Sequence, residues 1–284
     1  MKFENIRTYG WEAALRGMRN PKESWKLSDT IYGYEFDAAD SISARCNYRD
    51  CEILSRDNDI VEFLSIGHND MKLAQTLIKA GPEHRKFLRQ IMVSVDITAP
   101  LYWWKEFDTY KIGTVANSTS TMHKIQTKPI TLDCFEIGDF TNIEYPLSCQ
   151  RNDLKYPIDE DFVQMCLIPY LEYLRSRHNE LVKLAEKTSE PEEKKAILSV
   201  AKKVWKELIR WLPEGWLQTR TVTMNYETLL AICSKGQRRF HKLNEWSGID
   251  DTEIPSFIHT FARHLPYNKK FIFIDEDQDN LEQI

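Results

Sequence analysis

The chain has 284 residues, of which 42% are hydrophobic and 12% aromatic, so it can bury a core and does not have the composition of a disordered protein. Its formal charge is -5, with 38 basic and 43 acidic side chains, which gives no general attraction for DNA or RNA. No apolar run approaches the roughly 20 residues that cross a bilayer, and Met1 to Trp11, with Lys2, Glu4 and Arg7, lack the apolar core of a signal peptide. We therefore expect a cytoplasmic protein with no membrane or nucleic-acid partner.

The first elements are predicted between residues 69 and 107. Asn69 is expected to cap a helix that ends at Gly81-Pro82 and carries an apolar stripe of Leu73, Ala74, Leu77 and Ile78. Apolar residues then alternate with polar ones from Ile91 to Ile97, which predicts a strand with one buried face. Ala99-Pro100 ends this strand, and a helix is expected from Leu101.

The second half is predicted to be mainly helical. Long helices are expected over 159–178 and 189–211, the latter opened by a Ser189-x-x-Glu192 capping box with Pro191 in its first turn. Residues 131–143 form either a strand or a loop insertion. The predicted class is α+β, with helices packed on a small, mainly antiparallel sheet.

The segment from Ala99 to Lys124 combines aromatic, charged and hydroxyl side chains unusually densely. If the helix from Leu101 continues, Lys105, Asp108 and Thr109 share one of its faces. Residues 117–121 are too rich in hydroxyl and amide side chains for a helix and are expected to form a loop. Two interpretations remain open: a ligand-binding loop, or a solvated turn beside tryptophans (Trp103, Trp104) that serve a core or an interface.

The strand, the Ala-Pro pair, the helix and the loop together resemble the signature region of flavin-dependent thymidylate synthases. The Arg-His-Arg triplet of that family falls on Thr109, Tyr110 and Lys111, and an Arg-Gln pair on its helix falls on Lys105 and Glu106. The resemblance implies FAD binding by Lys105, Thr109, Tyr110 and Lys111, with Tyr110 stacking on a ring and Lys111 meeting a phosphate. It implies substrate binding by Glu106.

The next part of the signature concerns the nucleotide. Its serine falls on Thr119, with Ser120 one position away, so these two are the candidate catalytic residues. Asn117 and Thr121 stand where the family has an acidic residue and an arginine, which implies that they contact the substrate.

A second stretch, residues 210–229, resembles the family's Leu-Pro and Thr-Val-Asn-x-Arg-Ser-Leu pattern. Asn225 matches its asparagine, a predicted cofactor contact, and Glu227 replaces its arginine. Arg210, Arg238 and Arg239 are candidate ligands of the nucleotide phosphate. The alternative for these arginines is the ordinary basic end of a helix.

The resemblance implies methylation of C5 of a uridine nucleotide, dUMP to dTMP, with FAD, NADPH and methylenetetrahydrofolate. It also implies a homotetramer that binds a pyrimidine nucleotide, and one domain over 1–284 with an N-terminal extension and an insertion near 125–155. Two alternatives are a non-catalytic or regulatory nucleotide-binding protein that has lost flavin, and a related pyrimidine-modifying enzyme. No metal site is expected, because neither the histidines nor the cysteines have metal-ligand spacing.

Overall fold

The structure is a computed structural model that describes residues 1–36, 51–57, 60–120, 124–137, 163–238, 240–249 and 254–274. The chain divides into two compact units. The first comprises Met1–Ile97, Phe107–Asn117 and Arg220–Ile284, and the second Thr98–Glu106 and Ser118–Thr219. None of the described helices is long and apolar enough to cross a membrane.

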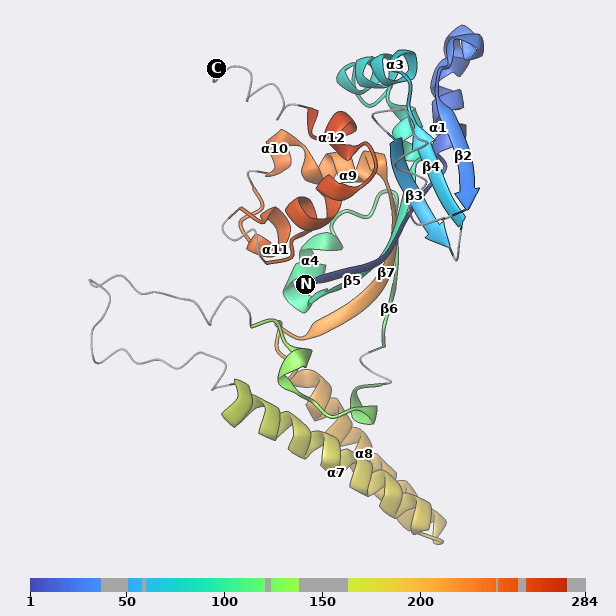
Figure 1. Ribbon diagram of the computed structural model, residues 1–284. Coiled ribbons are helices and arrows are strands. Elements are labelled where there is room, and N and C mark those ends of the chain that lie inside the picture. The colour runs from blue at the N-terminus through green and yellow to red at the C-terminus, as the bar shows by residue number, and fades with distance from the viewer. Residues whose placement is uncertain are drawn as a thin grey trace, which may run out of the picture. The chain divides into compact units, whose positions relative to one another are not determined.

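The larger sheet has four strands (Figure 1), in the order β1 (Lys2–Tyr9), β5 (Met92–Pro100), β7 (Leu217–Asn225) and β6 (Thr114–Ser118). The predicted alternation is confirmed, because Ile91, Val93, Val95 and Ile97 are all fully buried. Three of these strands, β5, β6 and β7, contain residues of both units.

A smaller antiparallel sheet of order β2-β4-β3 belongs to the first unit alone. Its strands are β2 (Ile31–Phe36), β3 (Cys51–Asp57) and β4 (Ile60–Ser65). In its register, β4 residue Ser65 lies opposite Ile31 on one side and Cys51 on the other, with an irregularity between Ile53 and Ser55. Together with the helices, this sheet confirms the α+β class.

The predicted helix near residue 70 is α3 (His68–Lys79), and its start differs from the prediction. Gly67 occupies the N-cap, while the backbone N–H groups of Asn69 and Asp70 donate to the carboxylate of Asp29 at 2.9 and 3.1 Å. Asp29 therefore satisfies the first free donors of the helix, although it lies about 40 positions earlier in the sequence. The predicted stop is confirmed, since Gly81 has a φ of 103° directly after the helix.

A buried charge cluster ties this helix to α1 (Trp11–Arg19). The Arg19 Nε donates to Asp70 at 2.6 Å, and the hydroxyls of Ser28 and Thr30 donate to the same carboxylate, each at 2.6 Å. Burial by itself would raise the pKa of Asp70, but the hydrogen bonds from Ser28, Thr30 and Arg19 and the Arg19 charge outweigh it and hold this pKa below its ordinary value.

The remaining helical elements of the first unit are short. They are Asn20–Lys22, Trp25–Leu27, η3 (Lys86–Arg89), α9 (Tyr226–Cys233), α10 (Lys235–Arg238), α11 (Asn244–Ser247), Phe257–Phe261, Ala262–His264 and α12 (Asn268–Phe271). Their core is aromatic: Trp11 packs edge-on against Tyr226, and Trp246 contacts Phe257. Such ring contacts bury large apolar areas and stabilise segments that are too short to be stable alone.

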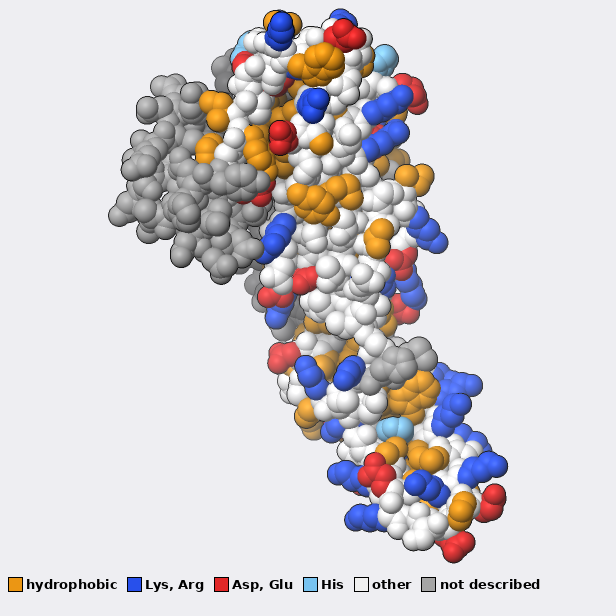
Figure 2. All heavy atoms as spheres, turned by 90° about the vertical axis from the view of Figure 1, so that its right-hand side faces the viewer, with side chains coloured by type: hydrophobic (Ala, Val, Ile, Leu, Met, Phe, Trp, Pro, Cys, Tyr) orange, Lys and Arg blue, Asp and Glu red, His pale blue; other side chains and the backbone are white. Residues whose placement is uncertain are grey.

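The second unit contains a helical hairpin of α7 (Ile168–Lys187) and α8 (Pro191–Arg210). The prediction of two long helices is confirmed: α7 follows directly on a π-helical turn over 163–167 and ends about nine residues later than expected, while residues 159–162 lie outside the described residues. The N-cap of α8 is Glu190 with Pro191 in the first turn, so the predicted cap at Ser189 is wrong by one residue. Exposed lysines line this hairpin (Figure 2), and those of α8 are Lys194, Lys195, Lys202, Lys203 and Lys206.

The base of the hairpin packs on short elements of the same unit. These are two 3-10 turns (Ile125–Thr127 and Leu132–Cys134) and a π-helical turn (Val163–Leu167); apart from Phe107, α4 (Leu101–Phe107) also belongs to this unit. Their apolar cluster contains Ile125, Ile130, Phe135, Leu171, Leu174 and Leu208. Residues 131–137 form a turn with an isolated bridge from Phe135 to Trp216, so the described part of the predicted strand or insertion is not a strand; the rest lies outside the described residues.

The tryptophans of the signature segment belong to the core, which confirms the structural interpretation for them. Trp103 and Trp104 are at most 1% exposed, and the Trp104 Nε1 donates to the Gln218 carbonyl at 2.9 Å. Because they are buried within one chain, they are unsuited to an interface between subunits. Trp211, directly after α8, is by contrast 54% exposed.

Candidate functional site

The candidate site begins at the turn after α4. The helix ends at Phe107, so the prediction that Asp108 and Thr109 continue a helical face with Lys105 is wrong. The Tyr110 backbone N–H donates to the Phe107 carbonyl at 3.0 Å, and the Thr114 hydroxyl donates to the Tyr110 carbonyl at 2.6 Å. These two bonds fold residues 107–114 into a compact turn.

This turn is fastened to the start of α9. The Asn225 Oδ1 accepts from the Thr228 backbone N–H at 2.9 Å, as expected of an N-cap, and the Thr228 hydroxyl donates to the Ile112 carbonyl at 2.7 Å. Gly113 makes the close approach possible: its φ is 78°, and an added Cβ would lie 2.4 Å from the Asn225 Nδ2. A glycine is therefore required for steric reasons as well as conformational ones.

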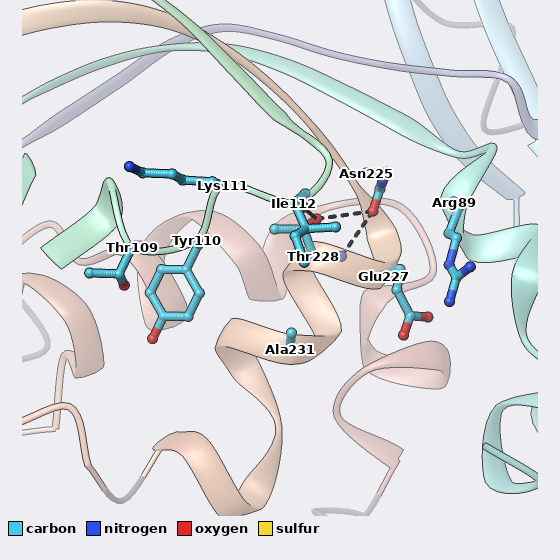
Figure 3. Close-up of a pocket in the computed structure, with 9 residues that line it drawn as sticks. All are labelled: Arg89, Thr109, Tyr110, Lys111, Ile112, Asn225, Glu227, Thr228 and Ala231. Carbon is cyan, nitrogen blue, oxygen red and sulfur yellow. Dashed lines mark hydrogen bonds between the residues drawn. The ribbon is translucent and has the colours of Figure 1, made fainter. Parts of the chain in front are cut away.

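Together the turn and the helix line a pocket with a volume of about 510 Å³. Figure 3 shows Glu227 and Arg89 on the same side of it, while the Lys111 side chain extends toward the other side. The lining residues are Arg89, Thr109, Tyr110, Lys111, Ile112, Asn225, Glu227, Thr228 and Ala231. Four of the five predicted cofactor contacts, namely Thr109, Tyr110, Lys111 and Asn225, thus lie in one pocket.

The charges of the pocket are unevenly paired. The Arg85 guanidinium group donates to the Glu227 carboxylate from two of its nitrogens. The Nε lies 3.1 Å from Oε1 and 3.0 Å from Oε2, and the Nη2 lies 3.0 Å from Oε1. Within the described part of the chain, neither Arg89 nor Lys111 forms an ion pair. The pocket therefore offers two cationic groups to a ligand, while its acidic residue is already neutralised.

An aromatic side chain forms the wall of the opposite end. The Tyr110 hydroxyl accepts from the Gln237 Nε2 at 3.2 Å, and its ring lies 6.0 Å from Trp246 and 6.5 Å from His241. The hydrogen bond and the two neighbouring rings hold Tyr110 against the pocket.

These residues fit an anionic ligand with a ring system, such as FAD. Tyr110 supplies an aromatic ring, Lys111 and Arg89 supply charge for phosphate, and the Asn225 Nδ2 is a donor because only its Oδ1 serves the helix cap. The Glu227 carboxylate is the one group that would repel a phosphate, and its pairing with Arg85 reduces that repulsion.

Five other predicted residues belong to the second unit. Lys105 forms an ion pair with Glu214 at 2.5 Å, and Arg210, in the last turn of α8, pairs with Glu207 at 2.6 Å. Glu106 lies in α4, close to its end. Thr119 continues the strand pairing after β6, with its backbone N–H donating to the Thr219 carbonyl at 2.9 Å, and Ser120 follows it.

The remaining predictions concern the ends of β6 and α10. Asn117 lies within β6 with its side chain exposed, so the prediction of a loop over 117–121 is wrong for its first two residues. The Arg238 guanidinium lies 5.1 Å from the centre of the Phe273 ring, a cation–π contact that the sequence does not indicate. Thr121 and Arg239 lie outside the described residues.

The pocket contains charged residues that the sequence analysis did not single out. Arg89 lines the pocket, and Arg85 forms the ion pair with Glu227. Both come from one short segment, because Arg85 is the N-cap of η3 and Arg89 is its last residue. In the sequence, Arg85 and Arg89 are distinguished only by lying four positions apart, shortly before the buried strand. Surface arginines with this spacing are common in proteins and do not by themselves indicate a site.

Comparisons with known proteins give structural matches only: no protein family matches the sequence, and no curated protein does. A flavin-dependent thymidylate synthase from Helicobacter pylori, complexed with FAD and dUMP, has a TM-score of 0.50 and 14% identity, over 97% of this chain and 99% of that one. A second structure of that enzyme with FAD and dUMP has a TM-score of 0.47, also at 14% identity, over 97% and 98% of the two chains. A UMP/dUMP methylase from Streptomyces cacaoi, bound with 5-Br dUMP, has a TM-score of 0.32 at 14% identity, over 59% and 63%. The first likeness extends over nearly the whole chain, and this protein therefore has the fold of the flavin-dependent thymidylate synthases, as its signature segment predicts.

Proposed function

We propose that the chain binds FAD in the pocket between the 107–114 turn and α9, and that it methylates C5 of a uridine nucleotide. The reaction would convert dUMP to dTMP, with methylenetetrahydrofolate as the carbon donor and NADPH as the reductant. The observation that carries this proposal is the convergence of Thr109, Tyr110 and Lys111 with Asn225, more than 110 positions later in the sequence, in one pocket.

The likeness in fold adds support, because the Helicobacter pylori enzyme with this fold was solved with FAD and dUMP. In the proposed complex, Tyr110 packs on a ring of the flavin, Lys111 neutralises a phosphate, and the Asn225 Nδ2 donates to the ligand. The bound flavin would supply the redox chemistry, and the protein would position its ligands and exclude water.

The nucleotide contacts remain those that the resemblance implies. Thr119 and Ser120 are the proposed catalytic residues, and the proposed substrate contacts are Glu106, Asn117, Thr121, Arg210, Arg238 and Arg239. A cytoplasmic homotetramer is proposed on the same ground. Light scattering on the purified protein tests the oligomeric state, and a monomeric mass would contradict it.

Flavin retention tests the proposal most directly. The purified protein would be mixed with FAD, desalted, and examined for the visible absorbance of oxidised flavin. We expect retained flavin in the wild type and loss of it in Tyr110→Leu, whereas Tyr173→Leu, at an exposed position on α7, should retain it. Formation of dTMP from dUMP, NADPH and methylenetetrahydrofolate then tests the reaction. A folded wild-type protein that retains no flavin would contradict the proposal.

A second candidate is a regulatory nucleotide-binding protein that has the fold without flavin. The observation that favours it is the Glu227 carboxylate in the pocket, together with Thr109 where the family has the first arginine of its triplet. This candidate predicts dUMP binding by calorimetry with no retained flavin. A related pyrimidine-modifying enzyme instead predicts retained flavin with a product other than dTMP.

A further inference from the structure

One end of the pocket contains three charged groups from two segments. Arg85 and Arg89 come from the turn before β5, and Glu227 comes from the first turn of α9, 142 positions after Arg85. Figure 3 shows Arg89 on the same side of the pocket as Glu227, with Tyr110 and Lys111 on the other side. One carboxylate and two guanidinium groups leave a net positive charge in this part of the protein.

The pairing within this cluster is selective. Arg85 makes three contacts with the Glu227 carboxylate at 3.0 to 3.1 Å, and both side chains are about one-fifth exposed, at 21% and 19%. Among the described residues, none forms an ion pair or a side-chain hydrogen bond with the Arg89 guanidinium, although it lines the same pocket. The Arg89 side chain is exposed, and with Glu227 paired to Arg85 its N–H donors are available to a ligand.

The chemistry of the free group indicates what it would bind. A guanidinium group presents a planar fork of N–H donors that matches two oxygens of a phosphate. The ring of such a ligand is uncharged and has flat apolar faces, which would contact Tyr110, Ile112 or Ala231 in the same pocket. The two kinds of surface correspond to the two parts of a phosphorylated ring compound.

We propose that Arg89 binds the phosphate group of the pocket's ligand, and that Arg85 is a positioning residue that prevents Glu227 from capturing Arg89. The inference rests on the proposed function only in taking the ligand to be a phosphorylated ring compound. A pyrimidine nucleotide and a flavin phosphate share this chemistry, and the experiment separates them.

The test uses two pairs of probes that differ by one phosphate: dUMP against deoxyuridine, and FMN against riboflavin. Calorimetry for the first pair and flavin fluorescence for the second give dissociation constants. We expect the phosphate to tighten wild-type binding roughly ten- to a hundredfold, as charge-assisted hydrogen bonds do. In Arg89→Gln this advantage should disappear, while the affinity for the unphosphorylated probe stays unchanged. Arg16→Gln, at an exposed arginine of α1 outside this pocket, should behave as the wild type.

Arg85 is tested by loss and rescue. In Arg85→Gln, Glu227 loses its partner and is expected to pair with Arg89, so the phosphate advantage should fall although Arg89 is intact. Adding Glu227→Gln to this variant removes the competing carboxylate and should restore the advantage. A merely structural role for Arg85 would give no restoration, and that result would overturn its part of the proposal.

The outcomes also separate this inference from the proposed function. If the wild type binds a phosphorylated probe more tightly but Arg89→Gln keeps that advantage, the inference is overturned and the proposed function stands. The same holds if phosphorylated and unphosphorylated probes bind equally. If the folded wild type binds none of the four probes, the proposed function fails and the inference with it.

Discussion

Two charge clusters of the first unit both combine arginine with a carboxylate. They differ in whether the hydrogen-bond donors of their arginines are all used within the protein. Around Asp70, both charged side chains are buried, at 4% exposure for Arg19 and 0% for Asp70, and Ser28 and Thr30 complete the hydrogen bonding. Around Glu227, Arg85 and Glu227 are partly exposed, and a second arginine, Arg89, remains outside the pair. The Arg19 donors are bound within the protein, whereas the Arg89 donors have no partner among the described residues and can bind a ligand.

The difference separates a structural charge cluster from a binding one. A buried ion pair stabilises only when hydrogen bonds satisfy the remaining donors and acceptors, as they do at Asp70. A cationic group that lines a cavity and has no partner in the described chain contributes little to folding and is available to a ligand. Four predictions test this distinction, from the largest expected effect to the smallest.

The largest effect is expected from Asp70→Asn. The substitution leaves the buried Arg19 guanidinium opposite a neutral amide, so the free energy of unfolding should fall by about 3 kcal/mol. Urea denaturation measures it. Glu180→Gln provides the control, because the Arg177–Glu180 pair is exposed and its loss should cost less than about 0.5 kcal/mol. A loss below about 1 kcal/mol for Asp70→Asn would show that the cluster is not structural.

Acid should have a similar effect by protonating the same carboxylate. Burial alone would raise the pKa of Asp70, but hydrogen bonds from Ser28, Thr30 and Arg19 hold it below the ordinary 3.8 in the folded state. The resulting stabilisation is present above pH 3.8 and is lost as the pH falls through the lower, folded pKa. The free energy of unfolding should therefore be measured from about pH 6 to about pH 2, roughly the range over which carboxyl groups titrate. It should decrease more steeply with falling pH for the wild type than for Asp70→Asn. Parallel curves would contradict this assignment.

Arg85→Gln should have a smaller effect on stability. The pair is partly exposed and Arg89 lies at the same end of the pocket to take over the carboxylate, so we expect a loss of about 1 kcal/mol in the free energy of unfolding. Thermal and urea unfolding measure it, with the Arg85→Gln/Glu227→Gln double variant as the control. If the free energy of unfolding fell as much as in Asp70→Asn, the cluster around Glu227 would be structural, like the one around Asp70.

The smallest effect is expected from Arg89→Gln without ligand. Since Arg89 has no ion pair in the part of the chain that the structure describes, the free energy of unfolding should change by less than about 0.5 kcal/mol. A saturating phosphorylated probe should then stabilise the wild type more than the variant, which a thermal shift measures. Strong destabilisation of the ligand-free variant would contradict the comparison.

Local sequence patterns predicted a helix or strand correctly where buried residues repeat at the spacing of that element. The alternation from Ile91 to Ile97 gave the buried strand, and Pro191 and Gly81 marked a helix start and a helix end. The prediction failed at Asn117, where hydroxyl and amide side chains indicated a loop and the chain forms β6 instead. Its place beside β7 in the sheet overrides the weak local preference, because strand formation depends on partners distant in the sequence.

The sequence by itself determined the fold prediction, through the resemblance of the strand, the Ala-Pro pair and the helix to the signature region, and it singled out Thr109, Tyr110, Lys111 and Asn225, which line one pocket. Only the tertiary structure decided how the charges are paired. Glu227 neutralised by Arg85, Arg89 left for a ligand, and Arg238 placed over Phe273 are contacts between segments distant in sequence. Charge pairing depends on a few ångströms of separation, and spacing along the chain does not fix such distances between segments that meet only in the folded protein.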